Sequence, residues 1–188
     1  MGIKKLLISC LFSLALVTPA MALQPCDGNC GGSSQPGCGG NGYNGCTEAI
    51  IEQIGGGNTA TITQDNNNNN YAKINQMGCS NDASIKQIGW SNHNEAIINQ
   101  TGGYNTADIN QHSFADHNDA FITQNGFGNT ATIDQYTDYN YASITQGMGH
   151  GVGNTATITQ GNFWGGQGYY TATITQYGWY NTATITQK

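Results

Sequence analysis

One seven-residue pattern, Asn-x-Ala-x-Ile-x-Gln, recurs twelve times between Thr47 and Gln187 of this 188-residue chain. The Ala, Ile and Gln positions hold the same residue in all twelve copies, and the opening position is Asn except at Thr47 and Tyr170. Self-similarity of this kind is typical of proteins whose units stack on one another. The chain is therefore expected to be a repeat protein from residue 47 onward.

The four fixed residues lie at alternate positions, so an extended strand directs all of them to one face, whereas a helix would scatter them. Successive closing glutamines are 11 residues apart within five of six pairs, which makes the true repeat two strands long. We predict an all-β fold. It is a β-solenoid of six stacked strand-turn-strand coils with an alanine and isoleucine core, which polymerises into a cross-β fibre.

The inward side chains divide into a core and amide ladders, in which each side-chain amide donates to one neighbouring coil and accepts from the other. The core includes Ala60, Ile62, Ala131, Ile133, Ala183 and Ile185. The predicted glutamine ladders comprise Gln53, Gln64, Gln76, Gln87, Gln100, Gln111, Gln124, Gln135, Gln146, Gln160, Gln176 and Gln187. The predicted asparagine ladders comprise Asn58, Asn70, Asn81, Asn94, Asn105, Asn118, Asn129, Asn140, Asn154 and Asn181.

The connection inside the five regular pairs has the form Gln-x-Gly-x-x-Asn, with glycine always at the same place. Glycine adopts positive φ without a steric penalty, which suits a tight turn. The predicted turn glycines are Gly55, Gly78, Gly102, Gly126 and Gly178. Connections between pairs vary in length and composition, and the longest spans residues 161–169.

The two terminal coils lack a neighbour on one side, and a buried amide without its partner costs roughly 1 to 3 kcal/mol. A second copy that covers each end removes this cost, so the ladders predict polymerisation. From Tyr139 to Gln187 the sequence contains no Asp, Glu, Lys or Arg. We therefore expect the last coil to be the most adhesive edge, while Asp108, Asp119 and Asp134 temper association of the middle coils.

The sequence before the repeats has two parts. Residues 1–22 have a basic start, an apolar stretch and an Ala-Met-Ala cleavage site, as in a secretory signal peptide. The apolar stretch is too short to span a membrane, and no second one follows. Residues 23–46 form a Gly- and Cys-rich segment expected to be flexible, and residues 47–188 form the repeat domain.

Four cysteines, Cys26, Cys30, Cys38 and Cys46, lie in the Gly-rich segment. Their spacing is unlike that of structural zinc sites, and export favours disulfides or cross-links over metal. The connectivity cannot be derived from the spacing. Cys79, in a predicted turn, makes the number of cysteines after cleavage odd.

The charge and the motifs exclude several functions. Beyond residue 22 there are three lysines, no arginine and eleven acidic residues, so 3 − 11 gives a net charge of −8. Such a chain is poorly suited to nucleic acid as its primary partner. No nucleophile, base and orienting acid occur at a recognisable catalytic spacing, and we expect no catalytic residue, metal site or cofactor.

The repeat resembles the curlin repeat of curli fibre subunits, whose Gln-x-Gly-x-x-Asn-x-Ala pattern and closing Gln are matched from Gln53 to Ala60 and at Gln64. The match recurs from Gln100 to Gln111, Gln124 to Gln135 and Gln176 to Gln187. The resemblance implies a left-handed solenoid and a secreted amyloid subunit, most like the major one, in an extracellular surface fibre of a Gram-negative bacterium. Such fibres serve biofilm matrix, adhesion and aggregation. The implied partners are further copies of the chain, a nucleator subunit, an outer-membrane secretion pore addressed by the Gly-rich segment, and periplasmic chaperones.

An alternative interpretation rests on outward-facing threonine triplets, such as Thr59, Thr61 and Thr63 or Thr182, Thr184 and Thr186. Flat threonine arrays of this type occur on ice-binding solenoids, so a monomeric ice-binding protein is the second hypothesis. An ice-binding array must be unbroken, however, and the second coil presents Asp82, Ser84 and Lys86 instead. Threonine is also simply well suited to exposed strands.

Overall fold

The computed structural model describes residues 47–65, 69–89, 92–112, 116–161 and 168–188, and these residues form twelve strands and no helix. The predicted signal peptide and Gly-rich segment, residues 1–46, lie outside the described residues. The strands are β1 (Glu48–Gly56), β2 (Thr59–Asp65), β3 (Tyr71–Cys79), β4 (Asp82–Ile88), β5 (Glu95–Gly103), β6 (Thr106–Gln111), β7 (Asp119–Phe127), β8 (Thr130–Gln135), β9 (Tyr141–Val152), β10 (Thr155–Gln160), β11 (Thr171–Gln176) and β12 (Thr182–Gln187).

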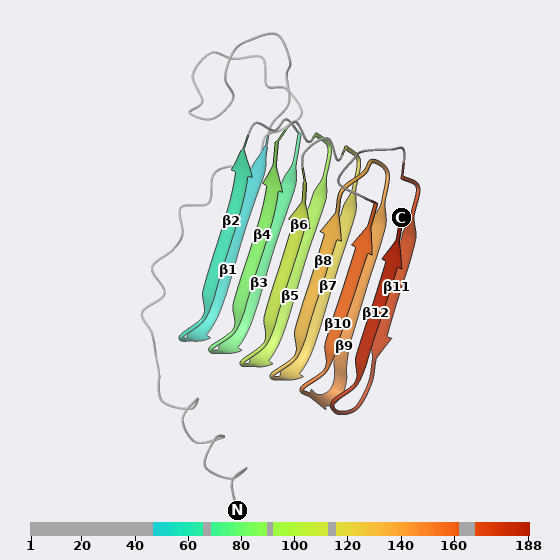
Figure 1. Cartoon of the computed structure of the whole chain (residues 1–188). Coiled ribbons are helices and arrows are strands. Elements are labelled where there is room, and N and C mark those ends of the chain that lie inside the picture. Colours follow the sequence, from blue (N-terminus) through green and yellow to red (C-terminus); the bar gives the residue numbers. More distant parts are fainter. Residues whose placement is uncertain (1–46, 66–68, 90–91, 113–115, 162–167) are drawn as a thin grey trace, which may run out of the picture.

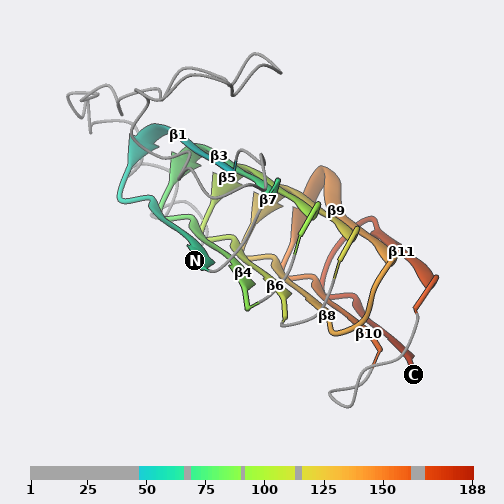
Figure 2. The ribbon, with the colours of Figure 1, turned by 90° about the horizontal axis from the view of Figure 1, so that it is seen from above.

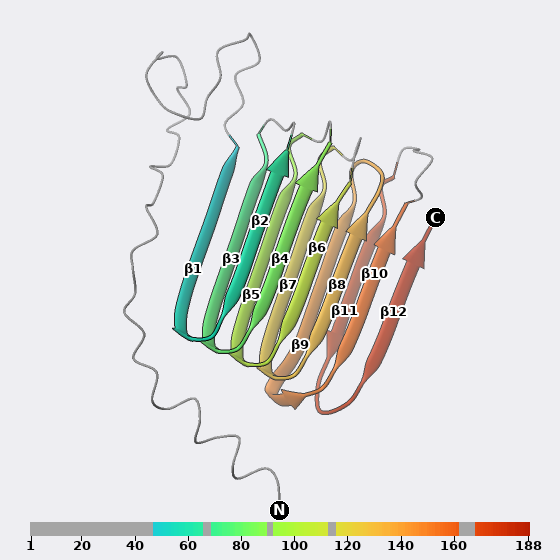
Figure 3. The same cartoon turned by 60° about the vertical axis from the view of Figure 1, so that its left-hand side comes forward.

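The odd-numbered strands form one parallel six-stranded sheet, here called sheet A, and the even-numbered strands form a second, sheet B. Each consecutive odd and even strand make one coil, so the predicted six-coil β-solenoid is confirmed (Figure 1). The first coil (β1 and β2) and the last coil (β11 and β12) stand at opposite ends of the stack (Figure 3). Viewed from above, the two sheets face each other as separate layers (Figure 2).

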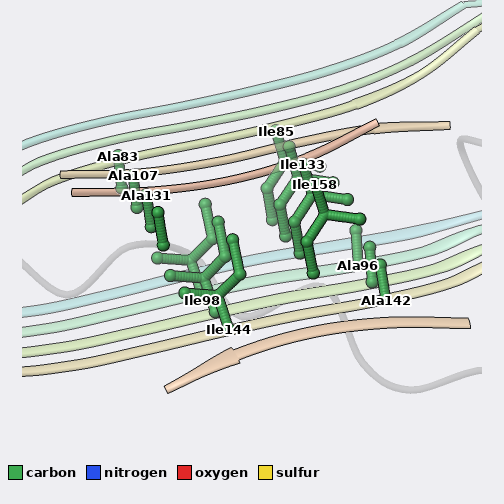
Figure 4. Close-up of a cluster of buried hydrophobic side chains, with 14 of the residues drawn as sticks. Ala83, Ile85, Ala96, Ile98, Ala107, Ala131, Ile133, Ala142, Ile144 and Ile158 are labelled. Carbon is green, nitrogen blue, oxygen red and sulfur yellow. The ribbon is translucent and has the colours of Figure 1, made fainter. Parts of the chain in front are cut away.

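Every pair of neighbouring strands places the Ala, Ile and Gln of one copy beside the same residues of the next. This register is enforced because a shift by one residue would turn the apolar set to the outside. The isoleucine rows of the two sheets lie between the two alanine rows (Figure 4). The inward isoleucines of coils two to five are completely buried, whereas Ile51, Ile62 and Ile185 in the end coils are only partly covered.

The irregular spacing between Gln146 and Gln160 is absorbed in the turn that follows β9. Gln146 remains in register with Gln124, but the next paired residue is Gly151, which lies opposite Gly126. The extra residues form a bulge at the end of β9, which leaves the inward ladder intact. Gly151 thus occupies the turn position that the glycine pattern fills in the other five coils.

Cys79 is the last residue of β3 and is disulfide-bonded. The other cysteines, including Cys26, Cys30, Cys38 and Cys46, lie outside the described residues. Among the residues placed by the structure, no helix has the length and apolar character needed to cross a membrane.

Candidate assembly site at the two ends of the solenoid

The closing glutamines form two continuous ladders, one in each sheet. In sheet A the Nε2 of Gln53 donates to Oε1 of Gln76 at 2.6 Å, and the same bond repeats to Gln100, Gln124, Gln146 and Gln176 at 2.8 to 3.0 Å. In sheet B the ladder runs through Gln64, Gln87, Gln111, Gln135, Gln160 and Gln187 at 2.7 to 3.1 Å. Every bond points the same way, from the earlier coil to the later one, so the ladders are polar.

Every ladder glutamine except Gln53 also ties the two sheets together through an Nε2 hydrogen bond to a backbone carbonyl. Gln111, for example, donates to the carbonyl oxygen of Glu95 at 3.1 Å, across the coil in sheet A. Gln76 likewise donates to the carbonyl of Thr59 at 2.8 Å in sheet B. The buried amides are therefore satisfied on both hydrogens, as buried polar groups must be.

Asparagines that open the sheet B strands form a ladder of the opposite direction. Nδ2 of Asn81 donates to Oδ1 of Asn58, and the bond repeats through Asn105, Asn129, Asn154 and Asn181 at 3.0 to 3.2 Å. The backbone N–H of each later asparagine donates to the same oxygen. Donors in this ladder thus point toward the first coil, against the direction of the glutamine ladders.

Asparagines that open the sheet A strands are connected differently from the predicted amide-to-amide ladder. The Oδ1 atoms of Asn70, Asn94 and Asn118 accept from the backbone N–H of the next opening asparagine at 2.7 to 2.9 Å. Nδ2 of Asn140 turns to the carbonyl oxygen of Thr137 at 2.6 Å. The buried Nδ2 of Asn118 has no hydrogen-bond partner in the described part of the chain.

The end coils are where these ladders stop. Among the described residues, Oε1 of Gln53 and Oε1 of Gln64 in the first coil receive no hydrogen bond. In the last coil, Nε2 of Gln176 and of Gln187 each make one bond, to the carbonyls of Thr155 and Thr171, and keep one hydrogen without an acceptor there. The first coil therefore offers acceptors and the last coil offers donors.

Four of the five predicted turn glycines lie so close to the next coil that no side chain fits. A Cβ atom on Gly55, Gly78, Gly102 or Gly126 would overlap the backbone carbonyl of the following coil. Gly178, in the last coil, also has a positive φ, +85°, but the atom nearest to an added Cβ is 3.9 Å away. The side of Gly178 that corresponds to the crowded side of the other turn glycines faces outward, beyond the end of the stack.

In the eleven copies after the first, the residue before the opening position has a φ between 55° and 75°. Glycine occupies only three of these positions, Gly57, Gly128 and Gly153; the others include Asn, Ser, His and Tyr. The sequence analysis did not predict positive φ at this corner, although the corner always lies one residue before the opening position of the repeat. On one side of the solenoid the corner side chains stack in a column, with ring centroids of His93, His117, Tyr139 and Tyr169 separated by 4.8 to 5.1 Å.

The acidic residues on the outer faces differ in their surroundings. Asp119 lies in register beside Glu95 on sheet A, and burial together with the charge of Asp119 raises the pKa of Glu95. Burial also raises the pKa of Asp119. On sheet B, burial of Asp134 opposes its ionisation, but interactions with His112, Asn110 and Lys86 outweigh it and lower the pKa of Asp134.

His112 belongs to this sheet B group through two contacts. Its ring stacks on Tyr136 at a centroid distance of 4.2 Å, and its Nε2 lies 3.9 Å from Oδ1 of Asp134, beyond hydrogen-bonding distance. Nδ2 of Asn110 donates to the same Asp134 oxygen at 2.9 Å. Within the described ranges, no three His, Cys, Asp or Glu side chains gather in an arrangement that could hold a metal ion.

Two in-register parallel sheets, closed by polar amide ladders, define a β-solenoid repeat protein of a structural rather than an enzymatic class. Comparison with protein families matches the curlin associated repeat to residues 115–147 and 128–161, which span β7 to β10. Residues 115–161 thus carry the curlin associated repeat, which relates this stretch of the chain to the curlin family. No protein with curated annotation matches the sequence significantly.

Proposed function

We propose that this protein is the structural subunit of an extracellular curli-like amyloid fibre, which it builds by end-to-end stacking of solenoids. The observation that carries the proposal is the complementarity of the two ends. Gln176 and Gln187 present donors on the last coil, and Gln53 and Gln64 present acceptors on the first. A second copy placed head to tail continues both glutamine ladders in the direction they have inside the molecule.

The backbone supports the same arrangement. Strands β11 and β12 end sheets A and B on one side, and β1 and β2 end them on the other, so each end exposes unpaired parallel strand edges. Such edges are templates for pairing with another chain. Like ends would set donors against donors, whereas unlike ends pair donor with acceptor and keep all strands parallel.

The finer assignments rest on the resemblance to curli subunits. We propose that the fibre serves biofilm matrix, surface adhesion and cell aggregation, and that the subunit is of the major type. Secretion would require the predicted signal peptide, residues 1–22, and an outer-membrane pore that recognises residues 23–46. A nucleator subunit and periplasmic chaperones would set the time and place of assembly.

The proposal is tested by diluting residues 23–188 from denaturant and following thioflavin binding, electron microscopy and fibre diffraction. We expect unbranched fibres with reflections near ~4.7 Å and ~10 Å, a lag phase, and its removal by preformed seeds. A β-rich chain that stays monomeric at all concentrations would contradict the proposal.

One observation favours ice binding as a second candidate. Strands β8, β10 and β12 are adjacent in sheet B and align Thr130, Thr155 and Thr182 in one row and Thr132, Thr157 and Thr184 in the next. The array stops at β6 and β4, where Asp108 and Ser84 continue the second row. Inhibition of ice recrystallisation by the soluble monomer, abolished by Thr157→Val together with Thr184→Lys, would establish this alternative.

A further inference from the structure

Large apolar side chains are strongly exposed at the turns of the two end coils and at Tyr169, 66% exposed, in the connection before β11. Tyr180, Trp179 and Tyr177 in the β11–β12 turn are 79%, 69% and 62% exposed, and Ile54 in the β1–β2 turn is 60% exposed. Both turns have the same length, with four residues between the closing Gln and the opening Asn. Stacked in register, they would therefore match residue for residue.

The middle coils carry smaller polar residues where the end coils are apolar. The position after the closing glutamine is Ile54, Met77 and Tyr177 in coils one, two and six, but Thr101 and Asn125 in coils three and four. Both end coils thus carry an apolar side chain at this position, where a neighbouring copy would cover it, and coil five has Gly147. This distribution is expected for a contact surface, because exposed apolar side chains without a binding role are scattered singly over a protein surface.

Stacking of turns inside the molecule shows how these residues would meet. Tyr180 donates its backbone N–H to the carbonyl of Val152 at 2.9 Å, and its ring lies so close to Gly153 that a Cβ there would approach ring atoms to 2.8 Å. The ring of Phe127 covers Gly103 in the same way. In both cases the aromatic ring packs on a glycine of the preceding coil, so the face of the Tyr180 ring toward a following coil is open in the single molecule.

The first coil has glycine at both positions that would adjoin the aromatic pair of another copy. Gly56 and Gly57 correspond to Trp179 and Tyr180, because each lies three or four residues after its closing glutamine. Gly55 in turn corresponds to Gly178, whose outward side is open in the single molecule. At Gly55, Gly78, Gly102 and Gly126 that side meets the carbonyl of the next turn glycine, whereas at Gly151 it meets Gly147.

We infer that the β11–β12 turn, residues 177–181, is a docking surface for the β1–β2 turn, residues 54–58, of a second copy. Tyr177 packs against Ile54, the rings of Trp179 and Tyr180 lie over Gly56 and Gly57, and Gly178 receives the Gly55 carbonyl. Contacts between the aromatic turn and the glycine turn thus favour pairing of the last coil with the first coil of another copy. Backbone pairing at this corner does not distinguish between the two ends. This inference rests on the proposed function, since it specifies the junction of the proposed fibre.

Hydrogen bonding at the docking surface agrees with this arrangement. Inside the molecule, Nδ2 of Asn154 donates to Oδ1 of Asn129 and to the carbonyl of Gly178 in the following turn. Asn181 makes the first of these bonds and donates to the carbonyl of Tyr177 in its own turn at 2.6 Å, a contact that Asn58 and Asn105 make at 3.3 and 3.4 Å beside a bond to the following turn. The Gly55 carbonyl of a docked copy lies where the repeated bond requires it.

Gly178→Ala tests the junction selectively, because its Cβ meets no atom within van der Waals overlap in the single molecule but would overlap the docked Gly55 carbonyl. The matched control is Gly128→Ala, which has positive φ, +64°, and no atom within 4 Å of the added Cβ. Both variants carry the penalty of positive φ, and only Gly178→Ala obstructs docking. We expect Gly178→Ala to elongate wild-type seeds at least tenfold more slowly than Gly128→Ala does.

Gly178→Ala keeps an intact first coil, so it should still add to the last coil of a growing fibre and then block it. Mixed at one part in ten with wild-type chain, it should shorten the fibres seen by electron microscopy, while Gly128→Ala leaves their length unchanged. Wild-type rates and lengths with Gly178→Ala would overturn the inference while leaving the fibre intact. Absence of wild-type fibres would instead contradict the proposed function.

A second measurement does not depend on how a glycine variant folds. With Trp90 and Trp164 replaced by Phe, Trp179 becomes the sole tryptophan, and its quenching by acrylamide can be compared before and after assembly. Docking should reduce the quenching constant of Trp179 at least threefold, and shift its emission to the blue. Unchanged quenching in well-formed fibres would overturn the inference.

Discussion

The α-carbon of Gly102 faces the backbone carbonyl of Gly126 in the next coil so closely that a Cβ atom on Gly102 would overlap the oxygen. The same contact joins Gly78 to Gly102 and Gly126 to Gly151. Close packing of the turns thus requires glycine both for its positive φ and for its missing side chain.

Gly102→Ala should therefore be among the most damaging substitutions in the repeat domain. The φ of Gly102, +112°, is strained for any L-residue, and the overlap must push two coils apart. We expect a loss of at least about 3 kcal/mol in the free energy of unfolding, measured by guanidinium titration with circular dichroism. Gly128→Asn, at a φ of +64° with open space, should cost less than about 1 kcal/mol, since Asn tolerates this conformation. Equal losses in the two variants would contradict the steric argument.

Central and terminal ladder glutamines should differ in what they stabilise. Gln111→Leu removes a completely buried amide that donates to Gln135 and to two backbone carbonyls, leaving buried acceptors without a donor. We expect it to lower the stability of the folded chain by about 1 to 3 kcal/mol. Gln187→Leu, at the exposed end, should leave folding nearly unchanged and slow fibre growth instead. Guanidinium titration and seeded growth kinetics of both variants separate the two effects.

Acid should stabilise the solenoid through Glu95 and Asp119. The pKa of each carboxyl is raised in the folded chain, so the folded state binds more protons than the unfolded state between the ordinary pKa values, 4.5 and 3.8, and the raised ones. Stability is then highest below this window and decreases as pH rises through it. Glu95→Gln with Asp119→Asn should flatten the dependence of the unfolding midpoint on pH in this window. A dependence as steep as that of the wild type would contradict the assignment.

Asp134 should have the opposite sign. Because its pKa is lowered in the folded chain, its contribution is present at neutral pH and is lost as pH falls through the lowered value. Asp134→Asn is expected to destabilise the solenoid at neutral pH, whereas Asp119→Asn should stabilise it and shorten the lag before fibres form. The structure thus gives Asp119 and Asp134 opposite effects on stability, whereas the sequence analysis assigned them the same role. Unfolding midpoints of the two single variants at pH 7 are the measurement.

Core isoleucines should be costly to truncate because two thin rows fill the space between the sheets. Ile122 is completely buried in sheet A, and Ile122→Ala should cost about 2 to 5 kcal/mol in unfolding free energy. Thr132→Ala, on the outer face of sheet B, should change it by less than about 0.5 kcal/mol. A small effect of Ile122→Ala would mean that the backbone and amide hydrogen bonds, rather than apolar packing, provide most of the stability of the solenoid.

The repeat pattern was sufficient to predict the strands, their inward faces and their pairing into the coils of a β-solenoid, whereas the opening asparagines of sheet A are not connected by amide-to-amide bonds. These predictions succeed because side-chain alternation has an exact period of two, and because identical residues stacked in register leave few other arrangements. The pattern was less informative at the corners. Non-glycine residues such as Ser80 and Tyr139 adopt positive φ there, and the conformational preferences of serine and tyrosine do not predict it.

The irregular fifth coil shows the limit of counting residues. Spacing alone marks Gln146 to Gln160 as an exception, but it does not show that Gly151 takes the place of the turn glycine. The bulge is decided by pairing with Gly126 on β7, a residue more than twenty positions away in the sequence. Only contacts between coils could determine it.

The sequence by itself determined that this protein is a stack of β-strand pairs with an apolar interior and amide-lined edges. Only the tertiary structure decided the polarity of those edges: glutamine ladders donate toward the last coil, and the sheet B asparagine ladder donates toward the first. The physical reason is that residue type fixes which face a side chain occupies, whereas the direction of an amide bond depends on the position of the neighbouring coil. The same dependence leaves donors at Gln176 and acceptors at Gln53.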